Sequence, residues 1–589
     1  MNNGQQSWGD HVKHIFSKIG WFVKEKWKTY VVLFLLLIAI SLISLAPAYV
    51  LGRSIDTIVS GGLTKDSLVI LVFGLAMLPV ARYLLSFIYN QLSQKTAQTL
   101  TFQMRKRYLS HLFEMDSQFY EKYDKGDLIA RVTADLDAIT QAASSMLEGI
   151  IFNVGVILFA ITVMSLTISW QLTLISVSIM PIALTILNTI RNKKRKYIKR
   201  HREIYADMTE KILESVEGQK AIRAYVQEDN DLEKQYQAIN NDIESWRYIV
   251  KFENWFNPLF EVVYGIAYIL AFAFGIYFIM QQTMTLGGLI TFVSYIGMLY
   301  GPIISISNIF AQINNATISV DRLDEIMQQQ PVVHDVIDSK PIVSFQSIEF
   351  KNVTFKYPFD KQPVIKQISF TIHHGQTIGI VGPTGAGKST LIRQLLREFN
   401  VTDGQVFIDG LSIETYKVED IRNLVGYVPQ SHMLFRRSVE DNILIGNPNA
   451  SHQAFDRAVK IADFEKDLVY LQNDLQTMVG EAGATLSGGQ KQRLSIARAL
   501  VKDPQILILD DSLSAVDAKT EDTIIEHLKD FRKGKTNIIV AHRFSAVRDA
   551  DVIYVLENGR ITQKGTHHEL LRQEGWYKMQ YIQQMTMSR

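Results

Sequence analysis

The sequence of 589 residues contains no cysteine, which excludes a disulfide scaffold, a zinc site built on thiolates and a cysteine-peptidase domain. Positive and negative charges are also nearly balanced, because the sequence has 61 Lys and Arg and 59 Asp and Glu. The resulting net charge of +2 gives no signal for a nucleic-acid partner. The 13 histidines show no spacing typical of metal ligands, and we find no internal repeat.

Long apolar runs, in contrast, are abundant in the first half of the chain. Six such runs lie near 30–52, 67–89, 147–168, 170–190, 257–280 and 285–310. Each is about as long as a helix that crosses a bilayer, so together they predict a multi-pass membrane domain. A single run such as 170–190 would also fit a buried helix of a soluble protein. Lysines at 24, 26 and 28 precede a first run that is too long for a signal peptide.

The distribution of positive charge predicts the orientation of this domain. The long loops 90–146 and 191–256 carry seven and fourteen Lys or Arg, whereas the loop 53–66 has only Arg53 and Lys65. The positive-inside rule then places the N-terminus, both long loops and the second half of the chain in the cytosol. The basic run 191–202 resembles a nucleic-acid patch, but a segment beside the membrane that touches anionic lipid explains it better.

Both long loops have few helix breakers, so we expect the spans to continue about 30 Å into the cytosol as helices. Their turning points are predicted near 115–120 and 214–218. The segment 18–30 carries Trp21, Phe22 and Trp27 among lysines and predicts a helix that lies at the membrane interface. The predicted divisions are an interfacial segment 1–29, a membrane domain 30–327, a linker 328–344 and a second domain 345–589.

The second half contains the phosphate-binding loop pattern G-x-x-x-x-G-K-[ST] between a predicted strand, 376–381, and a helix from Leu391. Glycines in such a loop let backbone amides approach phosphates at the start of a helix. Lys388 would reach the β- and γ-phosphates, and Ser389 would ligate Mg²⁺. The predicted nucleotide-binding residues of this loop are Gly382, Pro383, Thr384, Gly385, Ala386, Gly387, Lys388, Ser389 and Thr390.

Further nucleotide-handling elements follow in a fixed order. Gln430 comes first, Leu-Ser-Gly-Gly-Gln follows at 486–490, and His542 comes last. Between them, the apolar run 506–509 predicts a strand buried on both faces of a mainly parallel sheet. Asp510 ends that strand, where its carboxylate can hold Mg²⁺ directly or through water.

Over residues 345–589 this order resembles the ATP-binding cassette of ABC transporters, and Leu-Ser-Gly-Gly-Gln is the sequence peculiar to it. The resemblance implies an α-helical membrane domain of six transmembrane helices with long cytosolic extensions, followed by an α/β P-loop cassette. The turns of the long loops would be coupling helices that dock on cassettes. The cofactors implied are ATP and Mg²⁺. The implied metal ligands are Ser389, Gln430 and Asp510, and the catalytic residues are Asp511, His542 and Gln430.

In this family two cassettes close head to tail, so that each signature loop covers ATP bound to the other cassette. The implied contacts to the partner's ATP come from Ser487, Gly488, Gly489 and Gln490. Tyr357 matches the family's aromatic residue that stacks on adenine, although an ordinary strand aromatic would also fit the local pattern.

One position departs from the family pattern. ABC cassettes place a glutamate after the magnesium aspartate, and this chain has Asp511. The loss of one methylene withdraws the carboxylate by about 1 Å, and such a misplacement can lower a rate ~10²-fold. The alternative is a tolerated exchange of one acid for another. An intact signature beside a weakened acid resembles one subunit of the bacterial heterodimeric multidrug exporters (the BmrCD and LmrCD type), including the segment 511–517.

The sequence therefore predicts an ATP-driven exporter subunit in a bacterial plasma membrane, with a second half-transporter that bears the glutamate as its partner. The expected cargo is an amphiphilic drug or lipid. Arg82 and Glu261 lie in or at the edge of apolar runs and are candidate functional residues, although Glu261 would also fit a water-facing position. A homodimeric lipid or peptide exporter is the alternative function. A non-transport cassette protein would lack the six spans.

Overall fold

The computed structural model describes residues 8–587 except 63, 359, 481, 482, 484, 485 and 515. The described chain forms two compact units. The first contains residues up to Ser110 together with Gly126–Gln328, and the second contains Gln329 onward together with His111–Lys125. A short segment of the first half of the sequence thus folds with the second half. Ala515 of the segment 511–517 and the first seven residues of the predicted interfacial segment lie outside the described residues.

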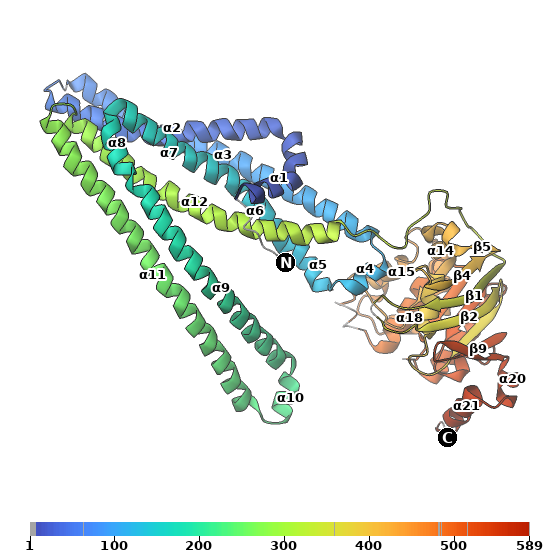
Figure 1. The fold of residues 1–589 in the computed structure, drawn as a ribbon. Helices are drawn as coiled ribbons and strands as arrows, with labels where there is room; N and C mark the ends of the chain where they lie inside the picture. Colours follow the sequence, from blue (N-terminus) through green and yellow to red (C-terminus); the bar gives the residue numbers. More distant parts are fainter. Residues whose placement is uncertain are drawn as a thin grey trace. The chain divides into compact units, whose positions relative to one another are not determined.

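The first unit is helical (Figure 1). Its helices are α1 (Trp8–Glu25), α2 (Trp27–Val59), α3 (Lys65–Glu114), α5 (Lys125–Ala130), α6 (Leu136–Met146), α7 (Asn153–Val163), α8 (Trp170–Val177), α9 (Ile179–Glu217), α10 (Gln219–Ala224), α11 (Glu228–Met280) and α12 (Leu286–Met327). Three π-helical segments connect α5 to α8, namely η1 (Arg131–Asp135), η2 (Leu147–Phe152) and η3 (Met164–Ser169).

Among the described residues, five helices are long and apolar enough to cross a membrane: Trp27–Val59, Leu68–Glu114, Lys125–Val177, Glu261–Met280 and Leu286–Ile306. The predicted span 170–190 coincides with α8 and the start of α9, where many side chains are not described, and it stays a prediction. With 53 residues, α11 is roughly 80 Å long at 1.5 Å per residue, far more than the ~30 Å hydrocarbon core of a bilayer. The helices thus extend well beyond their apolar parts.

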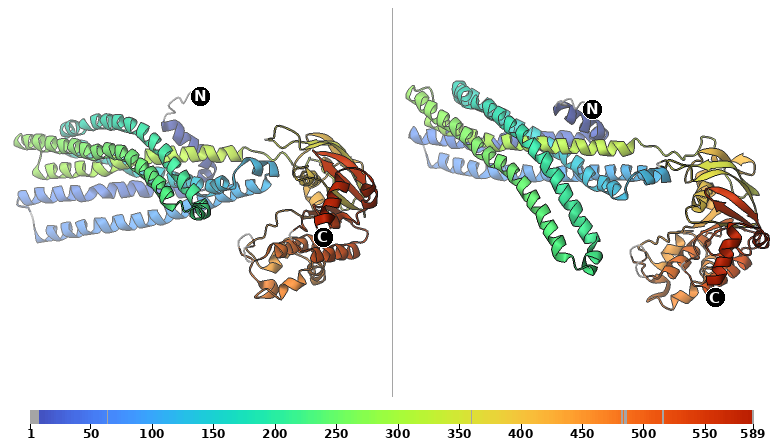
Figure 2. Two further views of the ribbon diagram at one scale, coloured as in Figure 1. Left: turned by 90° about the horizontal axis from the view of Figure 1, so that it is seen from below. Right: turned by 60° about the horizontal axis from the view of Figure 1, so that its bottom comes forward.

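Two turns connect the long helices close to the predicted places. The first holds α4 (Ser117–Lys122), whose N-terminus is capped by Asp116 through a bond from the Phe119 amide. The second lies at Gly218, where α9 ends and α10 begins, and Figure 2 shows α9 and α11 side by side with α10 at their tip.

The predicted helix 18–30 is wrong in its bounds, since α1 ends at Glu25 and α2 begins at Trp27. The apolar residues Ile15, Ile19 and Phe22 recur at helical spacing and are buried, so the apolar stripe of α1 begins before Lys18. This stripe packs within the first unit, where α1 contacts α12 and Lys18 pairs with Asp324 at 2.5 Å.

The second unit is built on two sheets (Figure 1). The four-stranded antiparallel sheet has the order β2-β1-β4-β5, with β1 (Ser347–Phe355), β2 (Ile365–His373), β4 (Asp403–Ile408) and β5 (Leu411–Ser412). The six-stranded sheet has the order β10-β9-β3-β8-β7-β6, with β3 (Thr377–Val381), β6 (Val425–Val428), β7 (Ile506–Asp510), β8 (Thr536–Val540), β9 (Val552–Glu557) and β10 (Arg560–Gly565). Only β10 runs antiparallel among these six strands.

The helices of the second unit after residue 329 are α13 (Lys388–Leu395), α14 (Val418–Leu424), α15 (Val439–Leu444), α16 (His452–Ile461), α17 (Glu465–Leu468), α18 (Gly488–Leu500), α19 (Ala518–Phe531), α20 (His567–Arg572) and α21 (Trp576–Met587). Strand β7 is buried at every position: Ile506 and Ile508 belong to one core, and Leu507 and Leu509 to the other. This confirms the predicted strand with two buried faces.

Candidate nucleotide site

The phosphate-binding loop joins the end of β3 to the start of α13. Gly382 has a φ of +152°, and a Cβ there would lie 2.0 Å from the Leu556 carbonyl oxygen. Gly387 caps α13 with a φ of +98°. Because a side chain at either position would collide or strain the backbone, the path of this loop requires glycine. The loop therefore delivers its amides to the N-terminus of α13, where an anion is favoured.

Lys388 is the buried cation of this loop, with 6% of its surface exposed. Its Nζ donates hydrogen bonds to the carbonyls of Gly382 at 2.8 Å and Pro383 at 3.0 Å. Burial lowers the pKa of Lys388, while the carboxylates of Asp511 and Asp510 oppose that shift. A phosphate beside Lys388 would supply the negative charge that such a cation favours.

Asp510 ends β7 and is 1% exposed, with both carboxylate oxygens bound. Oδ1 accepts a hydrogen bond from Ser389 Oγ at 2.9 Å, and Oδ2 accepts one from Tyr427 Oη at 3.3 Å. Burial raises the pKa of Asp510, and the two hydroxyl bonds oppose that effect. A hydroxyl and a carboxylate at bonding distance are hard oxygen ligands, and Mg²⁺ completes such a set with water and phosphate oxygens. The residues present therefore fit Mg²⁺.

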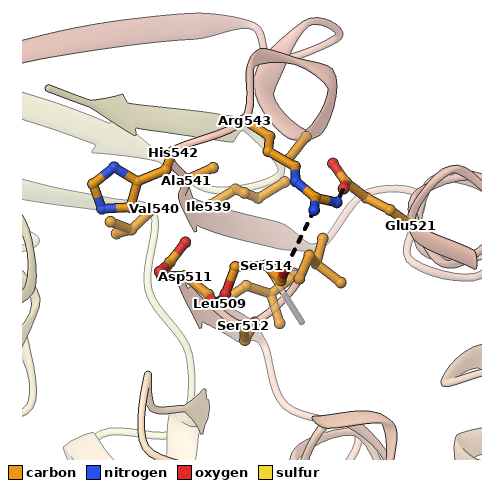
Figure 3. A pocket seen from close by; sticks show the side chains of 12 residues that line it. Leu509, Asp511, Ser512, Ser514, Glu521, Ile539, Val540, Ala541, His542 and Arg543 are labelled. Atoms are coloured by element: carbon orange, nitrogen blue, oxygen red, sulfur yellow. Dashed lines mark hydrogen bonds and ion pairs between the residues drawn. The ribbon is translucent and has the colours of Figure 1, made fainter. Parts of the chain in front are cut away.

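Asp511 follows directly and has an unusual backbone. Its φ is +49°, and its amide donates to the Val540 carbonyl at 2.8 Å, which ties it to β8. Its Oδ2 lies 3.5 Å from Gln430 Nε2. Figure 3 shows Asp511 and His542 lining one small pocket at the carboxyl ends of β7 and β8. Parallel strands bring these ends to one edge of a sheet, where α/β proteins commonly bind ligands.

The same pocket contains an ion pair between an exposed arginine and a buried glutamate. Arg543 Nη1 donates to Glu521 Oε2 at 2.8 Å, and Nη2 donates to the Ser514 carbonyl at 3.3 Å (Figure 3). Glu521 is 1% exposed and also accepts a bond from Ser545 Oγ at 2.6 Å. Arg543 therefore holds the loop after Asp511 to the segment that carries His542.

The signature residues open α18. Ser487 is the N-cap, and a reciprocal capping box joins it to Gln490: the Gln490 amide donates to Ser487 Oγ at 3.3 Å, and the Ser487 amide donates to Gln490 Oε1 at 2.9 Å. Ser487 and Gly488 are exposed. The positive end of this helix of 13 residues is thus presented at the surface, where it favours an anion.

Tyr357 follows β1 and is half-buried. Its ring packs against Phe355 and Phe399, with centroids 4.8 and 5.3 Å away. Its hydroxyl lies 3.1 Å from Thr390 Oγ1 and accepts a hydrogen bond from Arg393 Nη1 at 3.1 Å. Both contacts come from α13, so the helix that follows the phosphate loop also orients Tyr357.

Comparisons with known proteins decide the family. The model of the ABC transporter transmembrane region matches residues 30–303, and the ABC transporter model matches residues 365–514. The chain is 37% identical to the probable multidrug resistance ABC transporter ATP-binding/permease protein YheI of Bacillus subtilis, over 97% of both chains. It is 31% identical to the multidrug resistance-like ATP-binding protein MdlA of Escherichia coli, over 96% of both.

The chain belongs to the ABC transporter family. It is a half-transporter, with one membrane domain and one cassette, and its ATPase domain couples hydrolysis to export. A bacterial Atm1-family ABC exporter with ATP bound has the same fold, with a TM-score of 0.80, 25% identity, and coverage of 95% of this chain and 98% of that one. The predicted fold class is confirmed.

Apart from Tyr357, the predicted site residues of this ABC exporter fall into two groups. The loop 382–390, Gln430, Asp510, Asp511 and His542 lie at or just after the carboxyl ends of β3, β6, β7 and β8. Ser487–Gln490 stand apart at α18, and in the described part of the chain no hydrogen bond or ion pair joins them to the phosphate loop. Arg82 and Glu261 are exposed on α3 and α11.

Three residues of the site were missed by the sequence analysis: Tyr427, Arg393 and Arg543. Tyr427 lies on β6 three residues before Gln430, and no motif marks it. Arg393 lies one helical turn after Ser389 on α13, so helical spacing indicates that the two residues share a face of this helix. Arg543 directly follows His542, and its partners come from distant segments that only the fold brings together.

Proposed function

We propose that this chain is one half of a heterodimeric exporter, which binds ATP at a weakly hydrolytic site and lends its signature loop to the partner's active site. The observation that carries this proposal is Asp511 in the position after Asp510. Its carboxylate is one methylene shorter than a glutamate, and a displacement of about 1 Å can lower a rate ~10²-fold. The signature at 487–490 is intact and capped, which suits service to a competent site.

In this proposal the loop residues 382–390 hold the phosphates of ATP, and Lys388 supplies a charge-assisted contact. Ser389, Gln430 and Asp510 would hold Mg²⁺, which neutralises developing phosphate charge when bound. Asp511 and His542 would face the attacked phosphate, and Tyr357 would stack on adenine. The donor atoms already gathered around Asp510 support the metal assignment.

For transport, we propose that the membrane domain spans 30–327, the linker 328–344 and the cassette 345–589, with the N-terminus and the cassette in the cytosol of a bacterium. The exported cargo would be an amphiphilic drug or lipid, since the relatives bear multidrug-resistance names. Arg82 and Glu261 stay candidates for a role in the translocation path.

Two lysine variants measured side by side test the proposal. Lys388→Ala removes a charge-assisted contact of about 1.5–3 kcal/mol, which weakens ATP binding at this chain's site. Steady-state ATPase of the mixed complex should fall only partially, because the partner's site does most of the hydrolysis. The matching lysine variant in the partner should abolish turnover. Equal losses in the two variants would show equivalent sites and favour a symmetric or homodimeric exporter.

A further inference from the structure

One guanidinium in the second unit contacts both the residue proposed to stack on adenine and the turn between two membrane-domain helices. Arg393 Nη1 donates to Tyr357 Oη at 3.1 Å and lies 3.3 Å from Glu121 Oε1 of α4. Its Nε donates to Glu398 Oε2 at 2.7 Å. The guanidinium carbon also lies 4.7 Å from the ring centre of Phe399. Arg393 thus contacts four side chains.

Tyr357 has little freedom of its own. Its ring is packed edge-on against Phe355 and Phe399, and its hydroxyl is shared between Thr390 and Arg393. A displacement of Arg393 therefore changes the position of the Tyr357 hydroxyl, and the ring rotates with it. Thr390 belongs to the phosphate loop, so the adenine end and the phosphate end of the site share this anchor.

The turn that carries Glu121 is anchored at both ends. At its start, Asp116 Oδ2 accepts bonds from the amides of Val332 at 2.6 Å and Val333 at 2.9 Å. At its other end, Glu121 pairs with Arg393 at 3.3 Å. The side chains of Glu121 and Arg393 are 32% and 28% exposed, so the pair is partly shielded from solvent. Glu121 therefore ties this turn to Arg393, a neighbour of Tyr357.

We infer that Arg393 is a positioning residue that links the α4 turn to the adenine end of this chain's own site through Glu121 and the Tyr357 hydroxyl. Arginine suits this task because its planar fork offers several donors at fixed angles, whereas lysine offers a compact point charge. The inference rests on the proposed role of Tyr357. It deepens that proposal, because a site that hydrolyses ATP weakly would report its occupancy to the membrane domain through this contact.

Photolabelling with 8-azido-ATP at 4 °C tests the link, because the reactive group sits on the base and the labelled chain is identified by its mass. The purified dimer is titrated for wild type, Glu121→Gln, Tyr357→Phe and the double variant. Glu121→Gln and Tyr357→Phe should each weaken the apparent Kd of this chain about two- to fivefold, as expected for a partly exposed pair. The double variant should be no weaker than Tyr357→Phe alone, because the effect of Glu121 travels through that hydroxyl.

Glu114→Gln is the matched control, since Glu114 is an exposed carboxylate at the end of α3 and should leave labelling unchanged. The inference is overturned if Glu121→Gln behaves like Glu114→Gln, or if the effects of Glu121→Gln and Tyr357→Phe multiply. Tyr357→Ala separates this failure from that of the proposed function: unchanged affinity in that variant would show that Tyr357 does not contact adenine at all.

Discussion

The residue that distinguishes this chain, Asp511, is held in a left-handed backbone conformation with φ of +49°. Aspartate and asparagine tolerate this region better than other side chains, because their short polar groups bond locally. Glutamate in the same place adds strain of order 1 kcal/mol. The backbone therefore favours the shorter acid here, independently of catalysis.

Asp511→Glu is expected to raise hydrolysis at this site while lowering stability slightly. The added methylene recovers part of the ~10²-fold loss, and the strained backbone limits the gain to about tenfold. The measurement is single-turnover hydrolysis in a complex whose partner site has been inactivated. Asp511→Asn is the control, because it keeps the backbone preference but removes the charge and should give no gain. No gain with Glu would mean that something other than side-chain length limits the site.

Residues that act through sequence-local geometry could be predicted, and those that act through the fold could not. Gly382, Lys388 and Ser389 belong to one loop whose spacing predicts that they lie close together, and the structure places them so. Tyr427 reaches Asp510 only because β6 pairs with β7 in the sheet. Arg543 and Glu521 form their ion pair although β8 lies between them in the sequence. No spacing rule contains that information.

At the scale of elements, α18 depends on a buried ion pair for its placement. Arg493 donates from Nε and Nη2 to the two carboxylate oxygens of Asp467 at 2.6 and 2.7 Å, and the side chains are 9% and 6% exposed. This paired, two-bond geometry joins α18 to α17 and so orients the helix that begins with the signature.

Arg493→Met is expected to destabilise the cassette by about 3–5 kcal/mol, because it leaves Asp467 charged and buried without its partner. The measurement is the midpoint of guanidinium unfolding of the full chain. Replacing both partners, as Arg493→Met with Asp467→Leu, should recover most of that loss, since a buried pair is often exchangeable for apolar residues. A double variant as unstable as Arg493→Met would show that the pair itself is needed.

Secondary-structure elements could be predicted where the apolar pattern of the sequence was strong, but the residues at which helices begin and end could not. Strand β7 was predicted within one residue, because an unbroken apolar run has few other interpretations. Helix α13 begins at Lys388, three residues before the predicted start, since the loop glycine at 387 already serves as its N-cap. The break at Lys26 between α1 and α2 has no sequence signal, because neither proline nor glycine marks it.

For the whole molecule, the presence of one membrane domain and one cassette leads to a prediction about assembly. The chain purified alone should hydrolyse ATP feebly, and activity should appear when it is combined with a half-transporter that bears glutamate at the matching position. Mass spectrometry of the native complex identifies the partner, and ATPase assays of the chain with and without it measure the gain. Strong turnover by the single chain would contradict the asymmetric assignment of Asp511.

The boundary between the two halves of the molecule is not a single cut in the sequence. Residues His111–Lys125 fold with the second unit, which holds them through the amides of Val332 and Val333 in the linker and through Arg393 in the cassette. Cassettes could be exchanged between related half-transporters by joining the two sequences near residue 329. In such a chimaera the turn His111–Lys125 would still come from this chain, but it would have to pack against the cassette of the other protein. Domain exchange in this chain therefore calls for two grafts, the cassette and the fifteen-residue turn that accompanies it.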